Sequence, residues 1–134
     1  MEMRRFPRTV ASLEAIVAFV HGFLAERRID PERAYDADLV IEEVFTNMVK
    51  YGGGTSEIAI GLDADPVRLT IELRDDGVDE WDVTRSPAVD IDAPLEQRRS
   101  GGLGLYLVKR IAESFRYTYR DRTSIVTVTT RLNS

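Results

Sequence analysis

Residues 39–51 read LVIEEVFTNMVKY and show the clearest helical pattern in the sequence. Apolar residues recur there at every fourth position and form one stripe that a core would bury. These residues are Val40, Val44 and Met48. Glu43 and Asn47 are also four positions apart, so their side chains project from one face of the helix. An amide oxygen is a suitable ligand for Mg2+, and a carboxylate can accept a proton from a hydroxyl or water. The same spacing is common on solvated helix faces, so a functional site and an ordinary surface both remain open.

The helix that carries this pair has clear signals at both ends. Asp30 followed by Pro31 predicts an N-cap and a first-turn proline. Three glycines at 52–54 end the helix after about Tyr51. Lys50 follows Asn47 by about one turn and lies on nearly the same side as Glu43 and Asn47, so its charge belongs to the same polar face.

The other elements are predicted from local patterns. Ser12 is expected to cap a helix that runs to about Arg28. Residues 3–10 are expected to form a strand, and Pro7 places this strand at the edge of the sheet rather than in its centre. Alternation of apolar and polar residues predicts strands at 56–62, 67–74, 114–121 and 124–132. Helical spacing predicts one more helix at 102–112. This order predicts an α+β fold with helices on one face of a mainly antiparallel sheet.

Two glycine motifs lie beside these elements. Asp75-Asp76-Gly77 follows a predicted strand, where a carboxylate suits the recognition of an amino group and where a plain turn is the alternative. Gly102-Leu103-Gly104 opens a helix, whose first N–H groups attract anions, and a flexible linker end is the alternative. Arg99 lies just upstream and is expected to add a charged contact to phosphate. The stretch between the two motifs lacks any periodic pattern, which is typical of a functional lid or a disordered segment.

Composition excludes several classes of site. The chain has 134 residues, no cysteine and one histidine, His21, so thiolate metal sites, cysteine nucleophiles and His-based triads are excluded. The net charge of −5 argues against direct binding of nucleic acid. The longest mainly apolar stretch, 13–24, is too short to cross a membrane, so a single cytoplasmic domain over residues 1–134 is expected.

The motifs and their order resemble the ATP-binding domains shared by gyrase, MutL and histidine kinases, the GHKL group. The chain is most similar to the small bacterial anti-sigma-factor serine/threonine kinases, over nearly its whole length. The matching motifs are Glu43-Val-Phe-Thr-Asn47, Asp75-Asp76-Gly77, Gly102-Leu103-Gly104 and Thr123-Ser124. Histidine kinases usually carry Asn four residues before the metal-binding Asn, whereas Glu stands at that position here.

The resemblance implies the Bergerat ATP-binding fold, a two-layer α+β sandwich with a mainly antiparallel mixed sheet, and an ATP lid at about 78–101. It implies that ATP and Mg2+ are cofactors, that Glu43 is the general base, that Asn47 holds the metal and that Asp75 binds adenine. The further nucleotide contacts expected are Lys50, Gly77, Arg99, Gly102, Leu103, Gly104 and Thr123.

The same resemblance implies a protein kinase that phosphorylates a STAS-type anti-anti-sigma protein and also binds a sigma factor or another regulator. Members of this family are often homodimers. Two departures from the family pattern are Asp79 and Arg122, since many members have glycine at both places. The alternatives are a nucleotide-dependent binding module with little or no kinase activity, and an ATPase module that activates a signalling enzyme by docking. Glu43 favours the kinase, because a pure binder needs no base.

Overall fold

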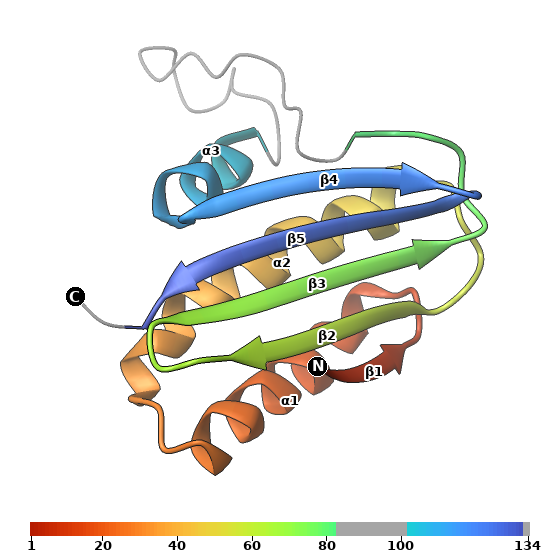
Figure 1. Cartoon of the computed structure of the whole chain (residues 1–134). Coiled ribbons are helices and arrows are strands. Elements are labelled where there is room, and N and C mark those ends of the chain that lie inside the picture. The colour runs from red at the N-terminus through yellow and green to blue at the C-terminus, as the bar shows by residue number, and fades with distance from the viewer. Residues whose placement is uncertain (83–101, 133–134) are drawn as a thin grey trace.

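The computed structural model describes residues 1–82 and 102–132, and within them five strands form one sheet in the order β1-β2-β3-β5-β4. The strands are β1 (Glu2–Phe6), β2 (Ile58–Ala64), β3 (Arg68–Asp76), β4 (Ser114–Arg120) and β5 (Thr123–Arg131). The helices are α1 (Leu13–Glu26), α2 (Ala34–Tyr51) and α3 (Gly102–Ile111). Figure 1 shows α1 and α2 on one face of the sheet, and α3 packs against α2. The prediction of a two-layer α+β fold is confirmed. The predicted sheet is mixed, but every pair of strands in the described residues is antiparallel.

The core lies between the helices and the inner face of the sheet. Ile60, Leu73 and Val126 occupy one row across β2, β3 and β5, and all three are fully buried. Val40 and Val44 supply the apolar stripe of α2 and are also fully buried. Each such side chain contributes about 1.5–3 kcal/mol by leaving water. The buried stripe therefore fixes the rotation of α2 and leaves its polar face pointing along the sheet toward α3.

The entry to α2 follows the predicted capping pattern. The Asp30 side chain accepts a hydrogen bond from the backbone N–H of Glu32 at 3.0 Å. A short 3-10 turn at Pro31–Arg33 then leads into the helix. Pro31 lacks the N–H that the first turn leaves unpaired, so it costs nothing there.

The N-terminal elements differ from prediction in their boundaries. β1 ends at Phe6, directly before Pro7, because proline cannot donate to the next ladder bond. Ser12 does not cap α1 with its side chain; its hydroxyl donates to the carbonyl of Pro7 at 2.8 Å and closes the loop instead. α1 ends at Glu26 rather than near Arg28, which has a φ of 56° and so lies outside the helix. No helix within residues 1–82 and 102–132 is long and apolar enough to cross a membrane.

We expect Gly22→Ala to stabilise the protein. Gly22 lies in the middle of α1 and is exposed, and nothing lies within 4 Å of the place a Cβ would take. Alanine favours a helix interior over glycine by about 0.5–1 kcal/mol. Urea denaturation is expected to show a free energy of unfolding higher by that amount. A lower midpoint would mean that Gly22 has a role the structure does not reveal.

Candidate functional site

Glu43 and Asn47 lie on the same face of α2, as their spacing predicts. Asn47 is only 7% exposed, and its Nδ2 donates to the backbone carbonyl of Glu43 at 2.7 Å. Because the amide nitrogen is held within the helix, the amide oxygen faces away from the helix backbone. One turn earlier, the Glu43 side chain is half-buried. The two side chains thus present oxygen atoms to the same region.

The first turn of α3 meets this face of α2 at Gly104. A Cβ added to Gly104 would overlap the carboxylate of Glu43. Any side chain at position 104 would therefore force that carboxylate to move. Gly102 and Leu103 lie in the same first turn of α3. The positive end of a helix dipole and its unpaired N–H groups lie at such a turn. The structure therefore brings together the Glu43–Asn47 motif and the glycine motif, which are far apart in the sequence.

Burial changes the acidity of Glu43. Removal from water raises the pKa of its carboxyl, the charge of Glu42 raises the pKa further, and Lys50 opposes both. A carboxylate with a raised pKa is a better proton acceptor near neutral pH than one at the surface. Lys50 is exposed, and its effect on the Glu43 pKa places its charge beside this polar face.

Asp75 lies at the end of β3 and is almost fully buried, with 1% of its surface exposed. Its Oδ1 forms an ion pair with the guanidinium of Arg8, a residue that the sequence motifs did not indicate. Burial raises the pKa of the Asp75 carboxyl, and the charge and hydrogen bond of Arg8 act in the opposite direction. A buried charge requires such a partner, because its desolvation is otherwise too costly.

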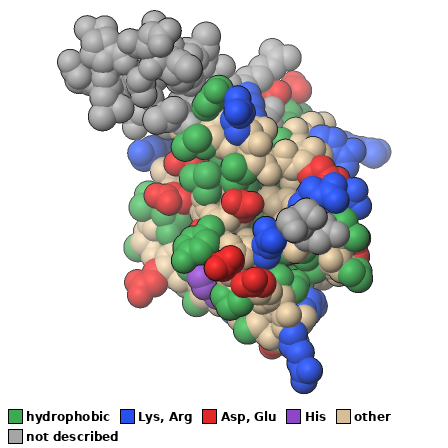
Figure 2. All heavy atoms as spheres, turned by 90° about the vertical axis from the view of Figure 1, so that its left-hand side faces the viewer, with side chains coloured by type: hydrophobic (Ala, Val, Ile, Leu, Met, Phe, Trp, Pro, Cys, Tyr) green, Lys and Arg blue, Asp and Glu red, His purple; other side chains and the backbone are tan. Residues whose placement is uncertain are grey.

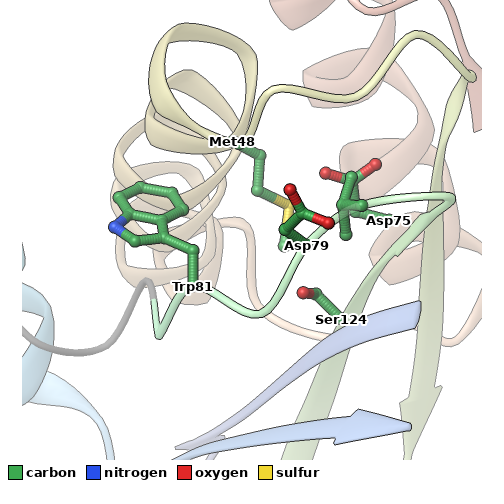
Figure 3. Close-up of a pocket in the computed structure, with 7 residues that line it drawn as sticks. Met48, Asp75, Asp79, Trp81 and Ser124 are labelled. Atoms are coloured by element: carbon green, nitrogen blue, oxygen red, sulfur yellow. The ribbon is translucent and has the colours of Figure 1, made fainter. Parts of the chain in front are cut away.

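A small pocket lies beside Asp75, and Figure 3 shows its main side chains. It is lined by Met48, Gly52, Asp75, Val78, Asp79, Trp81 and Ser124. The enclosed space is about 10 Å³, enough for one water molecule. A purine base would therefore enter only if the side chains at the mouth move. Trp81 stands at the mouth, packs edge-on against Tyr51 at the end of α2, and is 37% exposed.

The two departures from the family pattern contact each other. Arg122 donates to Asp79 at 2.9 Å and to the carbonyl of Gly77 at 3.3 Å. Arg122 has a φ of 61°, a conformation that favours glycine, which explains why glycine is common in the family at that turn. Gly77 itself has a φ of 69°, a backbone conformation that favours glycine.

The chain that leaves β3 is attached to β4 by two tyrosines. The hydroxyl of Tyr119 donates to the carbonyl of Val78 at 2.7 Å. The backbone N–H of Trp81 donates to the hydroxyl of Tyr117 at 3.2 Å. The first five residues of the predicted lid are thus fixed to the sheet, and the remainder of the lid, 83–101, lies outside the described residues together with Arg99.

The structure gives Thr123 a different place from the one expected. Its hydroxyl donates to Asp76 at 3.0 Å on the outer face of the sheet, away from the pocket. Ser124 pairs with Asp75 across the strands, is buried, and lines the pocket. Successive strand residues point to opposite faces, so only one member of this Thr-Ser pair can reach the site.

The described residues do not form a cage of acidic, His or Cys side chains around a metal ion. Within residues 1–82 and 102–132, no group of three or more His, Cys, Asp or Glu side chains is arranged to hold a metal. Mg2+ is commonly bound by one or two protein oxygens together with substrate phosphates and water. The buried Asn47 amide, on the same face of α2 as Glu43, fits this mode, in which the phosphates supply most of the ligands.

The sequence pattern of the histidine kinase-like ATPase domain matches residues 6–130. The chain belongs to this family. The match includes α2, the pocket beside Asp75 and the first turn of α3, which are the parts of the site described above. Among curated proteins, a sequence search finds no match.

Solved structures share the fold of this histidine kinase-like ATPase domain. The RsbU and RsbW domains of Rv1364c from Mycobacterium tuberculosis align with a TM-score of 0.62 and 18% identity, covering 98% of this chain and 33% of that one. The Acinetobacter baumannii histidine kinase AdeS aligns with a TM-score of 0.51 and 13% identity, covering 100% of this chain and 69% of that one. The chain thus spans a third of the Rv1364c chain, and at these identities the similarity concerns the fold alone.

Proposed function

We propose that this domain binds ATP with Mg2+ and transfers the γ-phosphoryl group to a serine or threonine hydroxyl of a partner protein. The observation that carries the proposal is the contact between the Glu43 carboxylate and Gly104 in the first turn of α3. A proton acceptor thereby lies where a helix start would hold phosphate. The raised pKa of Glu43 supports the same role.

We assign the roles in the transfer from the positions of the described side chains and, for Arg99, from the family resemblance. Asp75 would accept a hydrogen bond from the adenine amino group, with Ser124 beside it in the pocket. The N–H groups at the start of α3 would hold phosphate, and Arg99 and Lys50 would add positive charge. Asn47 would hold Mg2+, which when bound offsets the charge of the phosphates. Glu43 would accept the proton of the attacking hydroxyl as the new oxygen–phosphorus bond forms and the bond to ADP breaks.

The proposed protein substrate is a STAS-type anti-anti-sigma protein, and a sigma factor or another regulator is the proposed second partner. The family resemblance and the fold shared with a chain that contains an RsbW domain support this choice. Acidic and basic side chains are interspersed on the face shown in Figure 2, without a continuous basic area there, which agrees with protein rather than nucleic acid as the partner. A cytoplasmic location and a homodimer belong to the same proposal.

A nucleotide-dependent binding module is the second candidate, because two departures from the family pattern, Asp79 and Arg122, pair with each other and Asp79 lines the pocket. Incubation with labelled ATP, Mg2+ and a STAS-domain protein separates the two candidates. The kinase predicts a phosphorylated serine or threonine on the STAS protein. Saturable ATP binding without any transfer would contradict the kinase and leave the binding module.

We expect Asn47→Ala to lower the Mg2+-dependent affinity for ATP by about 10–100-fold. Mutation of a residue that only supports a metal ligand already lowers metal affinity by that factor. Calorimetric titration with and without Mg2+ measures this difference. Asn47→Asp is the matched control, because it loses the same hydrogen bond to the Glu43 carbonyl but keeps an oxygen ligand. If the alanine variant binds ATP as the wild type does, Asn47 does not hold the metal.

A further inference from the structure

Arg8 connects three elements that surround the pocket. Its Nε donates to the carbonyl of Ser56 at 3.1 Å, and its Nη1 donates to the carbonyl of Met48 at 3.0 Å. Its Nη2 forms the ion pair with Oδ1 of Asp75. The side chain is only 10% exposed, so this arginine is built into the domain rather than lying on its surface.

The surrounding chain is shaped to hold this guanidinium. Gly54 passes over it, and a Cβ there would overlap the guanidinium of Arg8 and lie 2.6 Å from Val78. Met48 belongs to the last turn of α2, and its carbonyl also accepts a hydrogen bond from the backbone N–H of Gly52 at 3.0 Å. The end of a helix attracts a positive charge. Arg8 therefore places its charge at the end of the helix and pairs with a buried carboxylate at the same time.

The two oxygens of Asp75 have different surroundings. Oδ1 is held by Arg8, whereas Oδ2 lies next to Gly52, at 3.2 Å from the position of an added Cβ. Gly52 and Asp75 both line the pocket. The two backbone carbonyls hold the guanidinium of Arg8 in place, and its Nη2 in turn holds Oδ1 of Asp75. Oδ2 is thus presented to the pocket in one orientation, as a hydrogen-bond acceptor.

We propose that Arg8 is a positioning residue of the nucleotide site, which orients Asp75 so that Oδ2 accepts a hydrogen bond from the 6-amino group of adenine. This inference rests on the proposed function, because it assigns a base to the pocket. An ionised carboxylate can only accept hydrogen bonds, so it binds an exocyclic amino group and forms no hydrogen bond with a purine that lacks one. Arg8 would therefore determine base preference without touching the nucleotide.

The test compares ATP with purine riboside triphosphate, which lacks the 6-amino group, by calorimetric titration of the full chain. A hydrogen bond to a charged group predicts that the wild type prefers ATP by about 10–100-fold. Arg8→Met is expected to lose at least about tenfold of this preference, through weaker binding of ATP and unchanged binding of the analogue. Arg5→Met is the matched control, since Arg5 pairs with the neighbouring Asp76 at 3.4 Å on the surface and its loss should leave the preference unchanged.

Arg8→Lys keeps the charge, but its compact ammonium group cannot span the three separate acceptors that the planar guanidinium reaches, so an intermediate preference is expected. If Arg8→Met does not fold, the lysine variant carries the test. A wild-type preference in either folded variant would overturn the inference, and so would an equal loss of affinity for both nucleotides, which indicates packing alone. If the wild-type protein binds both nucleotides equally, base recognition by Asp75 fails, and the assignment of Arg8 falls with it.

Discussion

Glu43→Gln is expected to lower the rate of phosphoryl transfer by about 10²–10⁴-fold while ATP binding is retained. Glutamine has nearly the shape of glutamate but cannot accept the proton of the attacking hydroxyl. The wild-type rate should rise with pH as the carboxyl of Glu43 loses its proton, at a pH above the usual range for glutamate because burial raises its pKa. This limb of the pH profile should be absent from the variant. The measurements are single-turnover transfer rates across pH and the affinity for ATP.

Glu42→Gln is the control for this experiment, because Glu42 is the exposed neighbour on the same helix. This substitution removes a charge that raises the pKa of Glu43. The rise of the transfer rate with pH should therefore move slightly to lower pH, and the maximal rate should be unchanged. A raised pKa means that the folded state binds protons more tightly, so stability falls as pH rises through that pKa. We therefore expect Glu43→Gln to be no less stable than wild type at neutral pH. Undiminished transfer by Glu43→Gln would contradict its role as the base.

Gly104→Ala is expected to lower transfer by about 100-fold, the effect of a displacement of about 1 Å in a catalytic group. The new Cβ would occupy the place of the Glu43 carboxylate and force that side chain to move. The free energy of unfolding should change by less than about 1 kcal/mol, because the displaced group is the end of a flexible side chain and alanine favours the helix. Transfer rates and urea denaturation measure the two effects separately.

Gly22→Ala provides the matched control for Gly104→Ala, since it makes the same change in a helix with open space around it. It should leave transfer at the wild-type rate. Two results would contradict the predicted contact between α2 and α3: wild-type transfer by Gly104→Ala, or an equal loss of transfer in both variants.

Much of this site could be predicted because it depends on local spacing. A separation of four residues places Glu43 and Asn47 on one helix face in almost any fold. Asp30-Pro31 starts a helix through its own side chain and ring, whatever packs against them. Asp75 follows a strongly alternating strand, so its position at a strand end follows from the sequence.

The remaining features depend on contacts between distant parts of the chain. Arg8 and Asp75 are 67 residues apart, and no periodic pattern marks an arginine in a loop after the first strand. The choice between Thr123 and Ser124 depends on the register of β5 against β3, which one residue of slip would reverse. Likewise, Asp79 and Arg122 are two unrelated departures from the family pattern in the sequence. They form an ion pair only because the turn between β4 and β5 brings Arg122 close to Asp79.

The most direct test of the nucleotide site is a titration of the wild-type protein with ATP and Mg2+, followed by calorimetry and by tryptophan fluorescence. Trp81 is the only tryptophan of the chain and lines the small pocket, so its emission reports entry of a base. The structure predicts saturable one-to-one binding with a change in emission, and Asp75→Asn should lose about 10–100-fold in affinity. Absence of saturable binding at millimolar ATP, or binding that leaves Trp81 and the Asp75 variant unaffected, would contradict the assignment of this pocket to the nucleotide.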